Sequence, residues 1–408
     1  MTSKAFLKIA LVSQEYPPET ARGGIGSQTY AKAKGLSEMG HQVFVISRSI
    51  DEQRHEDTVG NITVIRIPGM ENNLPDMTEI VQWLTHSVVV AAEIEVLHKR
   101  TGIDIIDFPE WAAEGYAYLL NRTGWNSIPT VIQLHGPLVM FGHIMGWPEM
   151  NSAFFRIGTQ MEATSVQLAD AVYSSSQCST GWINKFYDSG KENIPTIHLG
   201  IDIEVFKPRQ VSKNERLTIL FVGKIVQNKG VEELVDAAIN LVKDFPRLQV
   251  RLIGSGNEKY VAQLQERVKR SGTADLFDFA GFIDKEYLPL ELSKAHIFCA
   301  PSYYEGGPGF VYLEAMACGL PVIACSGSGV DEIISSGFNG LLVPPKDSVL
   351  LEDALRLVLT NKILLNEMSV NARDYVLREA DSNSCLQKLE TFYYSVIQSE
   401  PVKAALHD

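Results

Sequence analysis

The stretch "IFCAPSYYEGGPGFVYLEAMACGLPVIAC" (297–325) contains two continuously apolar runs, 297–302 and 321–325, on either side of a glycine-rich turn. Residues from about 310 to 318 have helical composition, and Gly319 ends this predicted helix because glycine readily takes the left-handed backbone of a helix terminus. Runs that are apolar without alternation are typical of parallel strands covered on both faces. The stretch therefore predicts a strand–helix–strand unit of an α/β sheet.

The same alternation of short strands and amphipathic helices fills most of the chain. The segment 231–242, for example, places its apolar residues on one helical face. This order predicts an α/β protein with two doubly wound, Rossmann-like domains. The candidate strands lie at 8–14, 42–47, 62–67, 103–108, 130–134, 171–176, 217–223, 248–254, 277–282, 297–302 and 321–325.

A polar stretch interrupts this rhythm at 201–218, where Pro208 occurs and no periodicity is visible. We therefore expect an N-terminal domain at 1–205 and a C-terminal domain at 206–385. A last helix at about 386–400 is expected to pack back on the first domain. Ligands of such folds bind at the carboxyl ends of the strands, so a cleft between the two facing domains is the expected site.

The composition excludes several classes of protein. The 408 residues carry 36 basic and 49 acidic side chains, a net charge of −13, which argues against nucleic-acid binding. The five cysteines form no CxxC pair, no metal-binding motif occurs, and no apolar run reaches the roughly 18 residues of a membrane span. The N-terminus is predicted to form a first strand rather than a signal peptide, so we expect a cytoplasmic protein. We also expect that it needs no metal and no cofactor.

Two strand-end loops of the first domain carry candidate binding residues. The loop "EYPPETARGGIGSQ" (15–28) has Gly23, Gly24 and Gly26 at a helix start, where backbone amides can approach an anion. The next strand runs out at Ser47-Arg48-Ser49 without an acid, so a nicotinamide site is poorly supported. His135 follows another strand and could contact a ligand, although a structural histidine is the common alternative.

In the second domain, "GKIVQNKG" (223–230) places Lys224 and Lys229 between a strand end and a helix start. Two cations beside free amides suit a diphosphate without a metal, and a solvated loop is the equal alternative. In "GFID" (281–284), Phe282 could stack on a base or belong to the core.

The opening stretch holds two carboxylates. Glu314, one turn into the predicted helix, can accept two hydrogen bonds from a vicinal diol such as a ribose. The amides of Gly309, Phe310 and Val311 point out of the helix start toward any phosphate. Glu305, in the turn, could reach sugar hydroxyls or a developing positive charge.

Taken together, these motifs resemble the retaining glycosyltransferases of family 4, which have the GT-B fold, over nearly the full length of the chain. The order and spacing of the motifs make the resemblance specific. They are "GGIGSQTYAKAKGLSEMGHQVFVIS", "IDIIDFPEW", "VIQLHG", "IHLGIDIEVFKP", "ILFVGKIVQNKG", "LIGSGN", "GFI", "EGGPGFVYLEAMACGLPVIA" and "GLLVPPKD".

The resemblance implies transfer of a hexose from a UDP-, GDP- or ADP-linked sugar to a sugar, lipid or small-molecule acceptor. It implies that Gly24, Lys224 and Lys229 hold the donor diphosphate and that Phe282 and Ile283 hold the base. It further implies that Glu314 binds the ribose, and that His135 and Glu305 face the transferred sugar.

Two positions depart from the family pattern. Lys224 stands where the family usually has arginine, so a bidentate fork is replaced by one ammonium group. Glu305 and Glu314 are nine positions apart rather than the usual eight, so a bulge must bring Glu305 back to the site. The alternative is that Glu305 points away and the loop amides alone hold the sugar.

Other activities stay open on the sequence alone: an epimerase of the same architecture, a phosphorylase, or a sugar-nucleotide binder that has lost turnover. The segment "PLVMFGHIMGWP" (137–148), with Met140, Phe141, Met145 and Trp147, could form an apolar acceptor surface or a peripheral membrane contact at the inner face of the membrane. A loop packed on its own core is the alternative. The oligomeric state is open.

Overall fold

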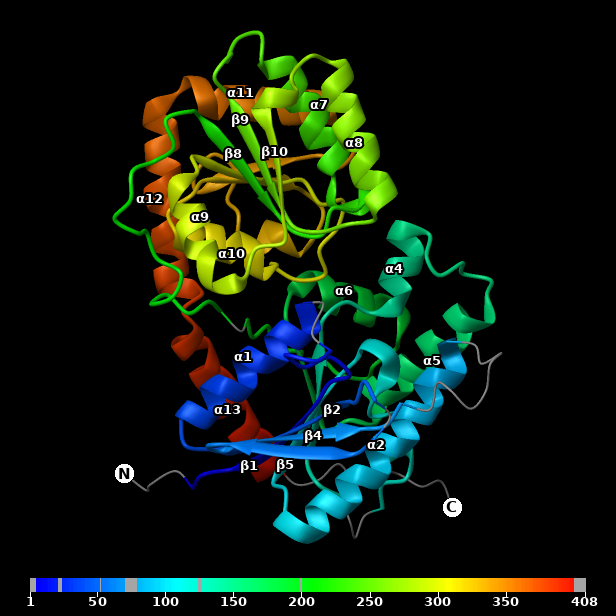
Figure 1. Ribbon diagram of the computed structural model, residues 1–408. Helices are drawn as coiled ribbons and strands as arrows, with labels where there is room; N and C mark the ends of the chain where they lie inside the picture. The colour runs from blue at the N-terminus through cyan, green and yellow to red at the C-terminus, as the bar shows by residue number, and fades with distance from the viewer. Residues whose placement is uncertain are drawn as a thin grey trace. The chain divides into compact units, whose positions relative to one another are not determined.

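A computed structural model of the chain describes residues 5–20, 24–51, 53–69, 79–123, 127–198 and 200–399. These residues form two compact units (Figure 1). The first unit runs to Leu199 and resumes at Cys385, and the second is Gly200–Ser384. The first boundary lies before the expected one at 205 because Ile201 donates its N–H to the Ala380 carbonyl at 2.7 Å, within the second unit.

The first unit is built on a seven-stranded sheet with the order β3-β4-β2-β1-β5-β6-β7. All neighbouring strands are parallel except β3 and β4. The strands are β1 (Lys8–Val12), β2 (Gln42–Arg48), β3 (His55–Val59), β4 (Ile62–Ile67), β5 (Ile105–Pro109), β6 (Thr130–Leu134) and β7 (Ala171–Ser174).

Helices cover both faces of this sheet, with α1 and α13 on one face and α2 and α5 on the other (Figure 1). The helices of the first unit are α1 (Gly24–Glu38), α2 (Glu79–Thr101), α3 (Tyr116–Leu120), α4 (Leu138–Met145), α5 (Ala153–Leu168), α6 (Gln177–Phe186) and the greater part of α13 (Ser382–Gln398).

The second unit has a six-stranded parallel sheet with the order β10-β9-β8-β11-β12-β13. Helices α7, α8 and α11 cover one face, and α9 and α10 the other (Figure 1). The elements are β8 (Thr218–Val222), α7 (Val231–Leu241), β9 (Gln249–Ile253), α8 (Glu258–Arg270), β10 (Phe277–Gly281), α9 (Leu288–Lys294), β11 (Ile297–Ala300), α10 (Phe310–Ala317), β12 (Val322–Cys325), β13 (Gly340–Val343), α11 (Ser348–Thr360) and α12 (Lys362–Glu379).

Each of the eleven strands predicted from the sequence is present, as are the helices predicted at 231–242 and 310–318. The prediction missed β3 and β13. Most of the side chains of β3 are polar and exposed, so this antiparallel edge strand carries no apolar run. The second, β13, has only four residues and directly precedes the prolines at 344 and 345, which read as a loop.

The apolar runs form the cores because parallel strands are enclosed by helices on both faces. All five residues of β5 and all four of β11 are buried. In α7 the predicted stripe faces the second core, with Val231, Leu234 and Val235 fully buried.

One helix of the described residues, α2, is long and apolar enough to cross a bilayer by length and composition, with a mean hydropathy of 1.4. In the structure this helix lies against the first sheet. Its face carrying Ile80, Val90 and Ile94 is buried, and Glu93 accepts two hydrogen bonds from Arg54, at 3.0 and 2.8 Å. The helix thus serves as a layer of the first unit.

The last helix, α13, closes the other face of the first sheet. Leu386 packs so closely on Gly35 of α1 that a Cβ there would lie 2.1 Å from its Cδ1. Glu390 lies 3.2 Å from the Nε2 atom of His41, and the Tyr393 hydroxyl donates to Asp107 of β5. The first unit is therefore assembled from both ends of the chain.

Candidate functional site

In the second unit the strand order reverses between β8 and β11, which are direct neighbours. In doubly wound folds the ligand crevice opens at this switch point, outside the carboxyl ends of the strands. The loop after β8 carries Lys224 and Lys229, and the loop after β11 carries Glu305 and leads into α10. The topology thus brings the two predicted donor-binding loops together.

The loop after β8 depends on a glycine. Gly230 has φ of 66° and directly precedes α7 as its N-cap residue, and a Cβ there would lie 2.0 Å from the carbonyl oxygen of Pro301, which follows β11. Tyr303 donates its backbone N–H to the Asn228 carbonyl at 2.9 Å, which ties the two loops a second time. Only glycine permits this approach, so Lys229 is held at the switch point.

Lys229 and Glu305 form an ion pair, with Nζ 2.5 Å from Oε1. Their side chains are 28% and 19% exposed, so the pair remains in contact with solvent. Despite the nine-position spacing, Glu305 therefore faces the lysine of the neighbouring loop. Its carbonyl accepts the Gly329 N–H at 2.9 Å, which anchors the turn.

The start of α10 follows directly. Gly309 adopts φ of 69° at the position before the helix, a left-handed backbone that disfavours other residues. Phe310 and Val311 are half-buried against the second core. The helix start thus lies beside the turn that carries Glu305, as the sequence predicts.

Glu314 is buried one turn into α10. Its side chain is 6% exposed and lies 3.5 Å from the ammonium group of Lys285, whose own side chain is 64% exposed. Burial raises the pKa of the Glu314 carboxyl, and Lys285 offsets part of this rise. A buried carboxylate that is paired with one solvated cation retains unused capacity to accept hydrogen bonds.

The remaining predicted donor residues are at the surface of the same unit. Phe282 follows β10 and is 74% exposed, so its ring does not belong to the core. The next residue, Ile283, packs partly against the second core. Lys224 is exposed after β8. An exposed aromatic ring at a strand end is available to stack on a planar group.

In the first unit the switch point lies between β1 and β5. Gly24 begins α1 and is exposed, and a Cβ there would meet no atom of the described chain within 4 Å. Packing among the described residues therefore does not explain this glycine. Gly23 lies outside the described residues.

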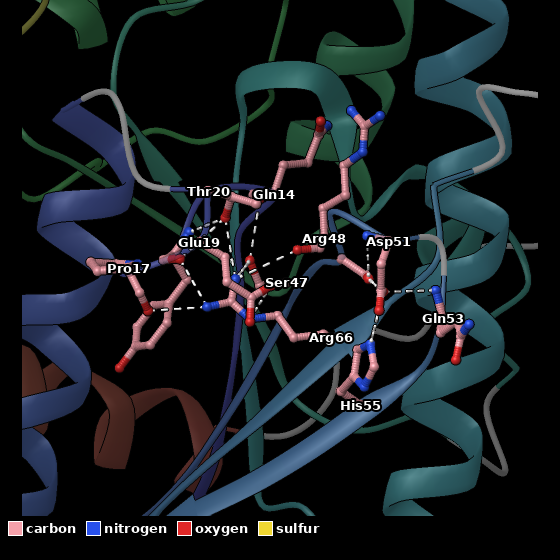
Figure 2. Close-up of polar contacts among 12 residues, drawn as sticks. Gln14, Pro17, Glu19, Thr20, Ser47, Arg48, Asp51, Gln53, His55 and Arg66 are labelled. Carbon is pink, nitrogen blue, oxygen red and sulfur yellow. Dashed lines mark hydrogen bonds and ion pairs between the residues drawn. The ribbon is translucent and has the colours of Figure 1, made fainter.

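The loop after β1 is held by Arg66, a buried arginine at the end of β4 (Figure 2). Its guanidinium donates to the Tyr16 and Pro17 carbonyls at 2.9 and 3.0 Å and to the Thr20 hydroxyl at 3.2 Å. Burial lowers its pKa, and the carboxylate of Glu19, 3.7 Å away, opposes that shift.

His135, after β6, is positioned through its backbone. Its N–H and that of Gly136 donate to Oε1 of Glu110 at 2.6 and 2.5 Å. The Nδ1 atom is enclosed without a hydrogen-bond partner among the described residues. Burial and the charge of Lys32 lower the pKa of His135 to about 3, so the imidazole is neutral at physiological pH.

Below this turn lie two carboxyl groups that the sequence patterns did not predict, Glu110 and Glu162, both 0% exposed. Glu162 accepts the Leu138 N–H at 2.8 Å and the Tyr187 hydroxyl at 2.5 Å. Burial raises the pKa of Glu110 to about 7, and burial together with the neighbouring Glu110 raises the pKa of Glu162 well above its usual range. The sequence does hold a sign of each group: Glu110 is an acid directly after a buried strand, and Glu162 is an acid within an apolar helix.

A second buried group centres on Lys32 of α1, which donates to Asp107, Gln133 and the Tyr173 hydroxyl at 2.8, 2.7 and 2.9 Å. Burial lowers the pKa of Lys32, and the paired Asp107 opposes this. In the part of the chain that the structure describes, no three His, Cys, Asp or Glu side chains gather as a metal site.

The segment 137–148 divides into two parts. Leu138, Val139 and Met140 are buried, as expected for a loop packed on its own core, and Phe141 is half-buried. Met145 and Trp147, in contrast, are 39% and 48% exposed.

Two doubly wound α/β units, each with a switch point at the carboxyl ends of its strands, are the architecture of the GT-B fold. Comparison with known families agrees: residues 22–205 match the model "Glycosyltransferase Family 4" and residues 202–375 match "Glycosyl transferases group 1". The chain belongs to the family 4 glycosyltransferases and has the GT-B fold.

Individual relatives extend over most of the chain. A glycogen synthase from Mycobacterium tuberculosis is 24% identical over 392 residues, covering 92% of this chain and 91% of the relative. The structure of sucrose-phosphate synthase from Thermosynechococcus elongatus has a TM-score of 0.80 at 22% identity, covering 96% of this chain and 99% of the other. HepE from Anabaena, solved with UDP and glucose, has a TM-score of 0.72 at 20% identity, covering 95% and 100%.

Proposed function

We propose that this glycosyltransferase moves a hexose from a nucleoside diphosphate sugar to an acceptor hydroxyl, with retention of the anomeric configuration. The observation that carries the proposal is the partly solvent-exposed ion pair of Lys229 and Glu305 at the switch point of the second unit. In this proposal Lys229 would serve as the cation for the diphosphate, and Glu305 beside it would be the carboxylate for the sugar. The complex of HepE with UDP and glucose supports a nucleotide sugar as the donor.

The chemical barrier is the development of charge on the departing diphosphate. Lys229 and Lys224, with the amides at the start of α10, would stabilise the leaving group as it becomes more negative. Two ammonium groups can supply this stabilisation, so the proposal needs no metal ion and no cofactor. Lys229 must then release Glu305 and turn to the phosphate when the donor binds.

The nucleoside would lie against α10 and β10. A ribose diol supplies two O–H donors to Glu314, which compensates the cost of burying that carboxylate. Phe282 would stack on the base, and the neighbouring Ile283 would contact its edge. Lys285, the present neighbour of Glu314, is solvated and can move aside.

The transferred sugar would lie between the freed Glu305 and the acceptor. Glu305 can accept from sugar hydroxyls and stabilise the oxocarbenium-like transition state. His135 would contact the sugar as a neutral hydrogen-bonding group, since its lowered pKa excludes the imidazolium form at neutral pH. Gly24 would admit the diphosphate to the start of α1.

We further propose that the protein acts in the cytoplasm, where sugar nucleotides are made and used, on a sugar, lipid or small-molecule acceptor. The exposed Met145 and Trp147 offer a peripheral contact with the inner face of the membrane. Such a contact would bring the enzyme to an acceptor that carries a lipid.

Thermal unfolding with UDP, GDP and ADP tests the proposal, because a ligand that binds only the folded state raises its stability. We expect one nucleotide to give a clearly larger shift than the other two. Incubation of the matching nucleotide sugar with an acceptor panel should then release the nucleotide only when an acceptor is present. Absence of any nucleotide-dependent shift would refute the donor site, and acceptor-independent conversion of the sugar would indicate an epimerase instead.

A further inference from the structure

The turn that carries Glu305 is rich in glycine, which leaves its own backbone many conformations. Residues 306–309 are Gly-Gly-Pro-Gly, and the spacing of nine positions between Glu305 and Glu314 makes the turn one residue longer than the family pattern. The Glu305 carboxylate nevertheless lies 2.5 Å from Nζ of Lys229. Contacts with neighbouring elements therefore contribute to fixing the turn.

Tyr303, two positions before Glu305, makes two of these contacts. Its backbone N–H donates to the Asn228 carbonyl at 2.9 Å, and its hydroxyl donates to Oε1 of Glu233 at 2.6 Å. Asn228 directly precedes Lys229, and Glu233 follows it by four positions, in the first turn of α7. Tyr303 therefore ties the turn that carries the acid to the segment that carries the lysine, on both sides of that lysine.

The bond between the Tyr303 hydroxyl and the Glu233 carboxylate is well supported. Both side chains are half-buried. Burial and the hydrogen bond to Glu233 raise the pKa of Tyr303, so the hydroxyl stays protonated and donates. A hydrogen bond to a carboxylate is about twice as strong as one between neutral groups. The ammonium group of Lys346, in the loop after β13, lies 5.1 Å from the centroid of the Tyr303 ring and adds a cation–π contact.

On its other side the turn is anchored through backbone atoms. The Gly329 N–H donates to the Glu305 carbonyl at 2.9 Å, and a Cβ at Gly329 would lie 2.6 Å from the carbonyl carbon of Gly307. Glu305 is thus held between this anchor and Tyr303. The Tyr303 hydroxyl can be removed without deleting any of the backbone contacts, so its contribution can be measured separately.

We propose that Tyr303 and Glu233 are positioning residues of the transfer reaction, because their hydrogen bond holds the Glu305 turn so that its carboxylate meets the transferred sugar. The inference rests on the proposed function, since it concerns the approach of Glu305 to that sugar. Neither residue touches the substrate in this role. A displacement of about 1 Å at a reacting group can cost about 10²-fold in rate, so the hydrogen bond should affect turnover more than binding.

The variant Tyr303→Phe tests the proposal, because it removes the hydroxyl and keeps the ring. Initial rates are measured with UDP-glucose, GDP-mannose or ADP-glucose, whichever the protein uses, and with an acceptor that supports transfer. We expect kcat to fall about 10-fold, with the KM for the donor within about two-fold of wild type and little change in the midpoint of thermal unfolding. The matched control is Tyr260→Phe, which should retain wild-type kcat. The Tyr260 hydroxyl is enclosed and has no hydrogen-bond partner among the described residues.

Two variants of Glu233 separate the hydrogen bond from the negative charge. Glu233→Gln keeps an oxygen that accepts from the hydroxyl, so kcat should stay within about three-fold of wild type, whereas Glu233→Ala should lose as much as Tyr303→Phe. The control Glu232→Ala, also in the first turn of α7, should retain wild-type kcat. Equal losses in Glu233→Gln and Glu233→Ala would overturn the inference, since the charge would then act rather than the bond.

A double variant tests whether the effect passes through Glu305. In a Glu305→Gln background, Tyr303→Phe should lower kcat by less than about two-fold further, because both changes act through one carboxylate. A further loss of about 10-fold there would overturn the inference. So would wild-type kcat in Tyr303→Phe when Glu305→Gln alone is slow, and that result would leave the proposed function intact.

Hydrogen exchange gives a readout that does not depend on activity. Tyr303→Phe should speed amide exchange in 301–309 and leave exchange in the first unit unchanged. Unchanged exchange in 301–309 would overturn the inference. Wild-type protein that transfers sugar from none of the three donors would refute the proposed function. Faster exchange in Tyr303→Phe would then still show that the hydrogen bond holds the turn.

Discussion

The two units place acidic side chains at their switch points in opposite ways. In the second unit Glu305 is partly open to solvent and paired with Lys229 at 2.5 Å. In the first unit Glu110 and Glu162 are fully enclosed and accept hydrogen bonds from backbone N–H groups, and the neighbouring Glu110 adds to the burial that raises the pKa of Glu162. Both units are doubly wound α/β sheets, so the difference lies in where the acids stand: Glu305 is in a loop, whereas Glu110 directly follows β5 and Glu162 lies within α5.

This difference separates two tasks. A half-open ion pair contributes little to stability and can exchange its partners for a ligand at small cost. An enclosed carboxyl that accepts two amides instead fixes the backbone at His135 and Gly136, and it responds to pH. We therefore expect substitutions in the second unit to change catalysis and those below His135 to change stability.

Lys229→Ala should give the largest effect. Loss of one preorganised cation at the leaving group is expected to lower turnover by about 10²-fold or more, with little change in the midpoint of thermal unfolding. The control is Lys243→Ala, at an exposed lysine just beyond α7, which should retain wild-type turnover. A turnover within a few-fold of wild type would remove Lys229 from the mechanism.

Glu110→Gln should change the pH dependence of stability. The folded protein holds the Glu110 proton up to a pKa of about 7, whereas the unfolded chain releases it near 4.5. Between these values the folded state binds more protons, so this residue's contribution to the free energy of unfolding falls as the pH rises. Glutamine still accepts both amides and removes this fall.

Relative to Glu110→Gln, the wild type should lose up to about 2 kcal/mol of stability between pH 5 and pH 8. Denaturant unfolding at a series of pH values measures the difference. Glu95→Gln, at an exposed position of α2, is the control and should parallel the wild type. Parallel curves for wild type and Glu110→Gln would show that Glu110 ionises normally.

Glu314→Gln should weaken the nucleotide. Replacing the charged acceptor of two hydroxyl groups is expected to raise the Kd of the preferred nucleoside diphosphate by about 10-fold. For the 2′-deoxy form of that nucleotide, the Kd values of the wild type and the variant should differ less. The control Glu286→Gln, at an exposed position beside Lys285, should retain the preference for the 2′-hydroxyl. If Glu314→Gln also retains it, the ribose lies elsewhere.

Lys224→Arg should have the smallest effect. A guanidinium can bind the diphosphate through two parallel hydrogen bonds, so we expect nucleotide affinity to rise by roughly two- to five-fold. Calorimetric titration of the variant beside Lys243→Arg measures this gain. Unchanged or weaker binding would indicate that Lys224 does not reach the phosphate.

The structural features that could be predicted from the sequence are those that produce a pattern among residues close together in the chain. Continuous apolar runs predicted β5 and β11, and a glycine-rich turn followed by "FVYLEAMAC" predicted the start of α10. The polar edge strand β3 has no such pattern. Local pattern also placed Glu305 in a turn, but the packing of Gly230 on Pro301 and the hydrogen bond from Tyr303 to Asn228 bring that turn to Lys229.

The buried polar groups escaped prediction for a related reason. Lys32 is an ordinary lysine on a helix until β5 brings Asp107 to it, 75 positions further along the chain. Arg66 ends a strand whose neighbouring loop is 46 to 50 positions earlier. Residues so far apart in the sequence form no recognisable motif, and only the register of the sheet shows that they are neighbours.

The return of α13 to the first sheet has a consequence for biosynthesis. Tyr393 completes the hydrogen bonds around Asp107, and Leu386 fills the space over Gly35, yet both residues are translated after the whole of the second unit. During translation, the core of the first unit therefore stays incomplete around Lys32 and Asp107 until the 185 residues of the second unit, Gly200–Ser384, have been synthesised. The second unit is continuous in sequence and can fold before the first unit is complete.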